Sequence, residues 1–126
     1  MKSINRIVID FIPQSEQRYD TCGDWFYNGK TLVLKISRTS DMRHQQLVAV
    51  HELVEALLCN VDGVTQEEVD AFDMGIGSDL DEPGNDLMCP CHAQHMIASA
   101  VERVMASAMR VDWAEYEQAV QDHGVK

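Results

Sequence analysis

The sequence has no excess of positive charge and no long apolar run. Its 126 residues include 10 lysines and arginines against 21 aspartates and glutamates, which gives a formal net charge of −11. Such a chain repels phosphate backbones and anionic lipid head groups, so we expect neither a nucleic-acid nor a membrane partner. No stretch approaches the ~18 apolar residues that a membrane span requires. The first apolar run is interrupted by Asp10 and is too short for a signal peptide, so we expect a cytoplasmic protein.

Internal repeats, low-complexity tracts and interdomain linkers are also missing. The length suits a single domain over residues 1–126, large enough to bury a core without disulfide bonds. The chain contains four cysteines, namely Cys22, Cys59, Cys89 and Cys91. In a cytoplasmic protein such residues serve as thiols or metal ligands more often than as disulfides.

The order of patterns along the chain predicts an α+β domain. A short apolar run at 6–12 is typical of a strand, and apolar segments flank Asn28-Gly29, a pair that favours a tight type I′ hairpin turn. From 41–59 the apolar residues recur at helical spacing. We therefore predict a small antiparallel sheet over residues 6–37, covered by this helix and by a long C-terminal helix. The C-terminal pattern is also compatible with two helices, with Asp112 and Glu115 as a second capping box.

Capping residues mark the helix ends. Ser40 or Asp41 is placed to begin the first helix, and Gly63 is placed to stop it. Thr65 and Glu68 have the spacing of a capping box, which predicts a shorter second helix. The glycine- and proline-rich stretch that follows predicts a loop before the C-terminal helix.

The first helix carries the segment VAVHELVEALLC, residues 48–59, in which three polar side chains stand among apolar ones. At ~100° per residue, His51, Glu52 and Glu55 share one narrow arc. One interpretation is that this arc is solvated surface. The alternative is that it lines a cleft, where His51 and Glu55, at i and i+4, bind one divalent ion and Glu52 acts as general base on water beside it.

A catalytic zinc site needs a third protein ligand, and the C-terminal helix offers one. His95 would complete the set, with His92 as an outer partner or a substitute. Asp70, Asp73 and Glu102 are further candidates for the third position. A different hypothesis is a closed structural zinc site made of four nearby side chains, Cys89, Cys91, His92 and His95, which would require the chain to turn within two residues.

Four segments carry a resemblance to a known family: LVAVHELVEALLC, GVTQEEVDAFDM, DEPG and PCHAQHMIASAVER. Together they resemble a family of small, largely uncharacterised phage and prophage proteins, over roughly residues 40 to 105, which would place this protein in the cytoplasm of a host cell. The residues that fall on the family's pattern are His51, Glu52, Glu55, Asp70, Asp73, Pro83, Gly84, His92 and His95. Cys91 stands where that pattern has a tyrosine.

Strands followed by an H-E-containing helix are also similar to the minimal zinc metallopeptidases of the gluzincin type. That resemblance implies a zinc-dependent peptidase or hydrolase with a peptide or protein substrate, in which an edge strand beside the active helix holds the substrate backbone. Glu55 stands where the H-E-x-x-H motif has its second histidine. A carboxylate at this position lowers the positive charge of the site and favours harder ions.

Two alternatives compete with the metallopeptidase hypothesis. Glu52-x-x-Glu55 followed by Glu67-x-x-Asp70 resembles the carboxylate pattern of MazG-like nucleoside triphosphate pyrophosphohydrolases, which use Mg²⁺ or Mn²⁺. Those proteins are helix bundles, whereas the first third of this chain has strand patterns. The other alternative is a non-enzymatic phage accessory protein with a structural metal site. Two imidazoles, one carboxylate and an open position favour zinc over magnesium, which makes zinc the expected cofactor.

Overall fold

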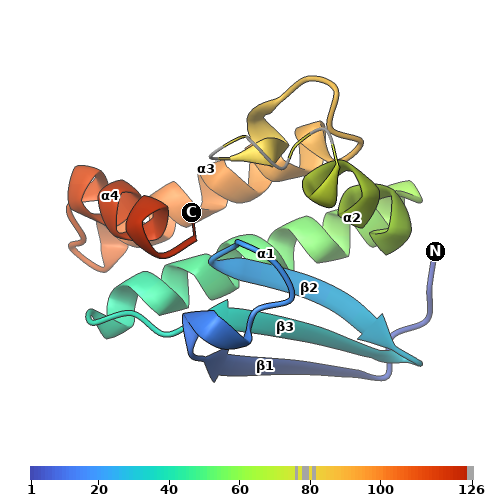
Figure 1. Cartoon of the computed structure of the whole chain (residues 1–126), viewed down its shortest axis with the longest axis horizontal. Coiled ribbons are helices and arrows are strands. Elements are labelled where there is room, and N and C mark those ends of the chain that lie inside the picture. The colour runs from blue at the N-terminus through green and yellow to red at the C-terminus, as the bar shows by residue number, and fades with distance from the viewer. Residues whose placement is uncertain (76, 78–79, 81, 125–126) are drawn as a thin grey trace.

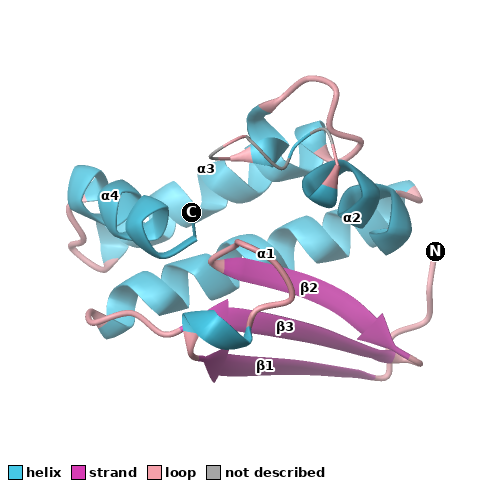
Figure 2. Ribbon diagram, viewed as in Figure 1, coloured by secondary structure: helices cyan, strands magenta, loops and turns pink. Residues whose placement is uncertain are grey.

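The computed structural model describes residues 1–75, 77, 80 and 82–124. It contains strands β1 (Arg6–Ile12), β2 (Gly23–Asn28) and β3 (Thr31–Ser37), followed by helices α1 (Met42–Asp62), α2 (Gln66–Met74), α3 (His92–Ala108) and α4 (Trp113–Gly124). Short 3₁₀ turns lie at Gln14–Glu16 and Pro83–Asn85. The strands form one layer and the helices gather on one side of it (Figure 1, Figure 2). The predicted α+β class is confirmed.

The sheet is mixed rather than wholly antiparallel. Its strand order is β1-β3-β2, with β2 antiparallel and β1 parallel to β3. The hairpin inserts β3 between the other two strands, and β3 therefore runs in the same direction as β1 after two chain reversals. The turn also differs from the expectation, because Asn28 pairs with Thr31 and only Gly29, at φ 60°, has a positive φ among the turn residues. A glycine at the first central position is typical of a type II′ turn.

One face of the sheet is covered by α1. Alternate residues of β3, namely Leu32, Leu34 and Ile36, are fully buried, as are Leu47 and Ala56 of α1. The alternation follows from the two-residue period of a strand, in which every second side chain faces the same layer. This packing holds α1 across β2 and β3, and so fixes the helix that carries the H-E-x-x-E sequence.

The predicted caps of α1 and α2 are confirmed. The Asp41 side chain accepts a hydrogen bond from the Arg43 backbone, and Gly63 ends α1 in the left-handed conformation at φ 75°. Thr65 and Glu68 form a capping box at the start of α2. Each of these contacts joins residues at most three apart, so local sequence is enough to predict them.

The C-terminal region forms two helices, the second of the two predicted arrangements. Arg110, with a φ of 57°, lies between α3 and α4, and the Asp112 side chain accepts a hydrogen bond from the Glu115 backbone at the start of α4. This break turns α4 back across α1 and α3, which brings Tyr116 to Glu102. Among the helices of the described residues, none has the length and apolar character to cross a membrane.

Candidate metal centre

Three ligand atoms from α1 and α3 converge on one point. His51 Nε2 lies 3.2 Å from Glu55 Oε2 and 3.1 Å from His95 Nδ1, and the last two atoms are 3.0 Å apart. Among the residues that the structure describes, this is the one group of three or more histidine, cysteine or carboxylate side chains that could hold a metal ion. The chain therefore has a candidate metal centre, formed by the three residues that the sequence predicts as ligands.

Helix geometry explains the convergence. Residues four apart lie on the same face of an α-helix, so His51 and Glu55 point to the same side of α1. The contacts of His51 with Glu102 and of Glu55 with His95 show that α3 runs antiparallel to α1. In tetrahedral zinc sites with ligand bonds of ~2.05 Å, neighbouring ligand atoms are about 3.3 Å apart. The observed triangle is close to that size.

Each histidine is anchored through its other nitrogen. His51 Nδ1 donates to Glu102 Oε1 at 2.8 Å, and His95 Nε2 donates to Asn85 Oδ1 at 3.1 Å. Tyr116 in turn donates its hydroxyl hydrogen to Glu102. If a metal ion replaces the inner protons, the outer nitrogens keep their hydrogens and the inner nitrogens direct lone pairs into the triangle, which is the arrangement that orients metal-binding histidines.

Glu55 is also held in one orientation. Trp25 Nε1 donates to Glu55 Oε1 at 3.3 Å, and this leaves Oε2 for the cluster. Burial raises the pKa of Glu55, but its hydrogen bonds with His51 and His95 lower it more, so the pKa lies below its ordinary value and the carboxylate is charged. Burial lowers the pKa of His51, whereas hydrogen bonds to Glu102 and Glu55 raise it well above its ordinary value. The buried triangle therefore favours a positive charge at its centre, carried by a proton or by a metal ion that displaces it.

Glu52 lies beside the cluster and does not belong to it. Its carboxylate packs over Gly23 of β2, where an added Cβ would stand 2.6 Å from Glu52 Oε1. Burial and the charge of Glu55 raise the pKa of Glu52 well above its ordinary value. Within the described part of the chain no group hydrogen-bonds this carboxylate, and Glu52 lines a cleft together with all three residues of the triangle. A carboxyl group with a raised pKa is a stronger base than an ordinary glutamate, and this one lies where it can reach water in the cleft.

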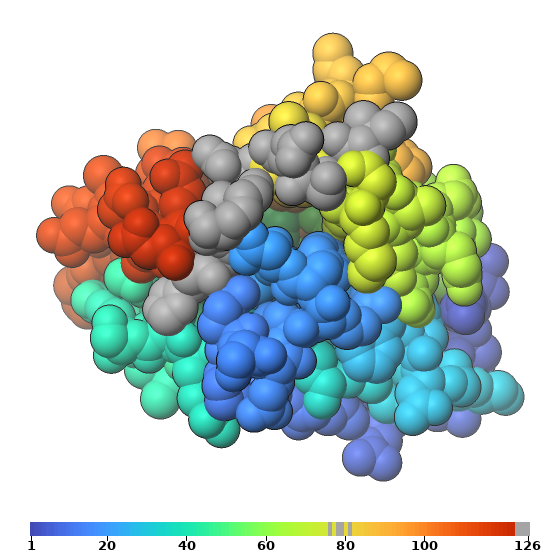
Figure 3. Space-filling view, in the orientation of Figure 1, coloured from blue at the N-terminus to red at the C-terminus, as the bar shows by residue number. Residues whose placement is uncertain are grey.

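The cleft has a volume of ≈ 470 Å³ and is formed by β2, the four helices and the Pro83–Asn85 turn. The space-filling view shows a hollow next to β2 and α2, with α1 visible at its base (Figure 3). Acidic groups predominate in its walls. Besides Glu55 and Glu102, they are Asp20, Asp24, Glu52, Asp70, Asp73, Glu82 and Glu117, whereas Arg103 is the arginine among the lining residues.

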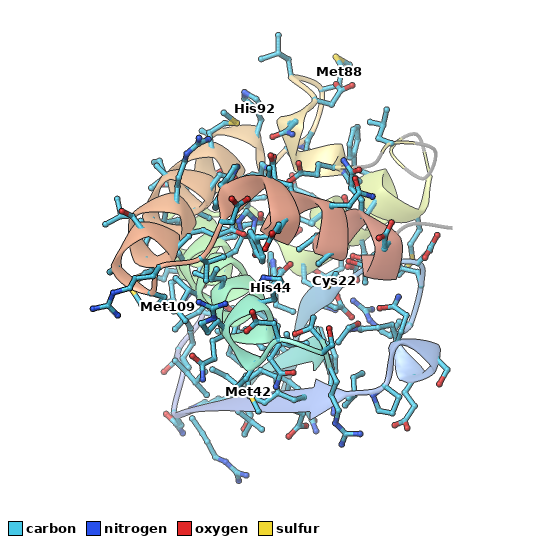
Figure 4. The ribbon with its side chains drawn as sticks, turned by 90° about the vertical axis from the view of Figure 1, so that its left-hand side faces the viewer. Cys22, Met42, His44, Met88, His92 and Met109 are labelled. Carbon is cyan, nitrogen blue, oxygen red and sulfur yellow. The ribbon has the colours of Figure 1, made fainter. Side chains whose placement is uncertain are left out.

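The other predicted ligand candidates lie elsewhere. His92 Nδ1 bonds to the Gly84 carbonyl at 3.0 Å, and Figure 4 shows His92 near the loop with Met88, at the end of the molecule away from the sheet. Asp70 forms an ion pair with Arg18, and Asp73 accepts from the Tyr19 hydroxyl. Neither aspartate contacts a histidine of the triangle.

The hypothesis of a closed Cys/His zinc site is wrong for a similar reason. The thiols of Cys89 and Cys91 contact each other, while His92 bonds to Gly84 and His95 turns into the triangle. His92 has a different role, because it holds Gly84 against the His95 ring: an added Cβ on Gly84 would lie 2.3 Å from His95 Cγ. The Pro83–Asn85 turn thus positions His95 from two sides.

Sequence patterns missed three residues of this centre, namely Trp25, Asn85 and Tyr116. Their partners are 30, 10 and 14 residues away in the chain, and each contact joins two different elements, so no pattern within one element indicates it. The acidic D-x-P-G loop indicated the neighbourhood of Asn85, but no pattern indicated its contact with His95.

Replacing Glu102 by Gln should lower zinc affinity about 10- to 100-fold, because the amide is a weaker acceptor for His51 Nδ1–H and no longer favours positive charge at the ring. Competition with a chromogenic chelator measures the affinity. Glu115→Gln, a change at an exposed residue of α4 outside the cleft, is the matched control and should bind zinc like the wild type. Equal affinities for both variants would show that Glu102 does not support the site.

Comparison with known proteins adds no relative to this picture. No protein-family model, no curated protein and no solved structure matches the chain. The function must therefore be argued from the geometry of the site.

Proposed function

We propose that this protein is a zinc-dependent hydrolase of the metallopeptidase type, which cleaves a peptide or amide bond. His51, Glu55 and His95 are the metal ligands, and Glu52 is the general base. The observation that carries the proposal is the triangle of ligand atoms at 3.0–3.2 Å, anchored on the outside and open to a cleft that also contains Glu52.

The donor set supports zinc as the ion. Two imidazole nitrogens and one carboxylate oxygen leave a fourth tetrahedral position free, as in catalytic rather than structural zinc sites. When bound, zinc supplies a Lewis acid that polarises a carbonyl group and makes water more acidic. Magnesium prefers oxygen ligands, so a site with two imidazole nitrogens argues against that ion.

Glu52 supplies the proton transfer. Its carboxylate lines the cleft beside the triangle, where it accepts a proton from the attacking water and donates it to the leaving amine. Gly23 makes room for this side chain, since any larger residue would push it from its place. The role of Glu52 as base is separate from metal binding, because its side chain is outside the triangle.

Strand β2 offers a place for the substrate backbone. The Ser37 backbone donates to the Cys22 carbonyl, so in an antiparallel pair Gly23, Trp25 and Tyr27 direct their backbone groups away from β3. The Tyr27 N–H is taken by Gln66, and the Thr21 hydroxyl donates to the Gly23 carbonyl. Trp25 lies between these two residues on the edge strand and lines the cleft. An extended peptide in the cleft can add to the sheet along this edge.

The pyrophosphohydrolase alternative has less support. It requires the carboxylates of α1 and α2 to surround magnesium ions, but Asp70 is paired with Arg18 and Glu67 is exposed. It also gives no role to the two histidines of the triangle. A non-enzymatic protein with a structural ion is the stronger competitor, because the ligands themselves are buried, with His51 at 8% and His95 at 7% exposure. The resemblance to phage proteins is compatible with both.

The test is hydrolysis of a mixed peptide pool by zinc-loaded protein, with chelator-treated protein as control. We expect new peptide termini, detected by mass spectrometry, that disappear after chelation and return with added zinc. Zinc binding without any cleavage would contradict the hydrolase and favour the structural ion.

The charge of the cleft predicts a preference among substrates. Acidic walls attract cations, so peptides with lysine near the cleaved bond should show a severalfold higher kcat/KM than peptides with glutamate there. The ratio should fall as salt is raised from low to physiological concentration. Glu82→Gln, at the cleft wall, should reduce the ratio, whereas Asp10→Asn on β1, paired with Lys35, should not. A preference for acidic peptides would contradict this expectation.

A further inference from the structure

A pair of thiols lies at the start of α3, outside the proposed metal centre. Cys89 and Cys91 are separated by Pro90, and their Sγ atoms are 2.7 Å apart. The Cys91 backbone N–H also donates to Cys89 Sγ at 3.4 Å. Cys91 is the N-cap residue of α3, and its carbonyl accepts from the His95 backbone. The turn thus holds two sulfurs in contact without a bond between them.

The two sulfurs differ in character. The contact with the Cys91 thiol, and then the hydrogen bond that the Cys91 backbone N–H donates to Cys89 Sγ, lower the pKa of Cys89 although burial raises it. Cys22 and Cys59 behave in the opposite way, because burial raises the pKa of each to about 12. The Cys91 backbone N–H thus favours the thiolate form of Cys89, whereas burial disfavours the thiolate forms of Cys22 and Cys59.

We propose that Cys89 and Cys91 are a peroxide-reactive pair that closes to a disulfide. The Cys89 thiolate attacks hydrogen peroxide, breaks the O–O bond and becomes a sulfenic acid with release of hydroxide. Cys91 sulfur then attacks Cys89 sulfur, and the sulfenic oxygen leaves as water. In total, two thiols and one peroxide give one disulfide and two waters.

The burial of the two sulfurs restricts the reaction to small oxidants. Cys89 is 4% and Cys91 2% exposed, so both sulfurs are shielded from bulky reagents. Cys91 lines the cleft, which gives a water-sized oxidant a route to the pair. Closing the gap from 2.7 Å to a disulfide bond of ~2.05 Å needs only a small movement of the turn. The inference does not depend on the proposed hydrolase activity.

The experiment treats the full-length, reduced protein with hydrogen peroxide, then labels the remaining thiols under denaturing conditions and maps them by mass spectrometry. We expect the loss of two hydrogen masses and of two labels, both from the peptide that contains residues 89–91. Cys22 and Cys59 should remain fully labelled. Because this mapping uses the unmodified chain, it does not depend on the folding of any variant.

Variants separate the two roles. Cys91→Ser should stop the reaction at the sulfenic acid, which a dione reagent traps at Cys89, and Cys89→Ser should slow oxidation at least tenfold. Cys22→Ser and Cys59→Ser are the matched controls and should react like the wild type. Four labelled thiols after treatment that fully oxidises free glutathione would overturn the proposal, as would a disulfide that joins either sulfur to Cys22 or Cys59.

Discussion

His95→Ala and His51→Ala should each weaken zinc binding by more than about 100-fold. Loss of an outer partner alone costs about 10- to 100-fold in metal affinity, and loss of a ligand removes a bond to the ion itself. Each change also leaves Glu55 without one of the two imidazoles that contact it. Calorimetry or chelator competition on protein of verified fold gives the affinities.

His92→Ala is the matched control for this prediction. It removes the same side chain three residues earlier on α3, from a position that contacts Gly84 and not the triangle. We expect its zinc affinity to remain within about tenfold of the wild type, since its effect passes through a single outer contact. Strong zinc loss in His92→Ala with wild-type binding in His95→Ala would show that the ligand set is wrong.

Glu52→Gln should retain zinc and lose hydrolysis by about 10²- to 10⁴-fold in kcat, the usual contribution of a general base. The amide keeps the size of the side chain that packs on Gly23, but it cannot accept the proton from water. Because Glu52 is not one of the three residues of the triangle, the zinc affinity of this variant should equal that of the wild type. This result separates it from the variants of His51 and His95.

The control for Glu52→Gln is Glu67→Gln, which removes an exposed carboxylate of the neighbouring helix α2. It should cleave the same peptide at the wild-type rate. Glu67 also belongs to the pattern of the pyrophosphohydrolase alternative. Loss of activity in Glu67→Gln together with normal activity in Glu52→Gln would therefore contradict the proposed role of Glu52 as general base and would support that alternative.

Local contacts of this fold could be predicted from sequence, but long-range ones could not. The caps at Asp41, Gly63 and Thr65 depend on residues within about one helical turn, and their prediction from sequence is confirmed. The parallel pairing of β1 with β3 depends on which strand enters the middle of the sheet, and residue patterns within each strand do not record that choice.

The helix that carries the site shows the same limit. Helical periodicity correctly placed His51 and Glu55 on one face of α1, but the interpretation of that face as solvated surface is wrong. Glu55 is 7% exposed, whereas Val61 of the same helix is 66% exposed. Periodicity tells which side chains lie together, and only the packing of α3 and α4 decides which face is covered.

The metal content of the protein, purified without chelators, tests the central claim most directly. Elemental analysis should find about one zinc per chain, because the triangle provides three protein ligands and an open position. The same preparation of His95→Ala should contain much less. Protein that contains no stoichiometric metal, and that binds none when zinc is added, would contradict the account, since the buried His51, Glu55 and His95 would then be a hydrogen-bonded cluster without an ion.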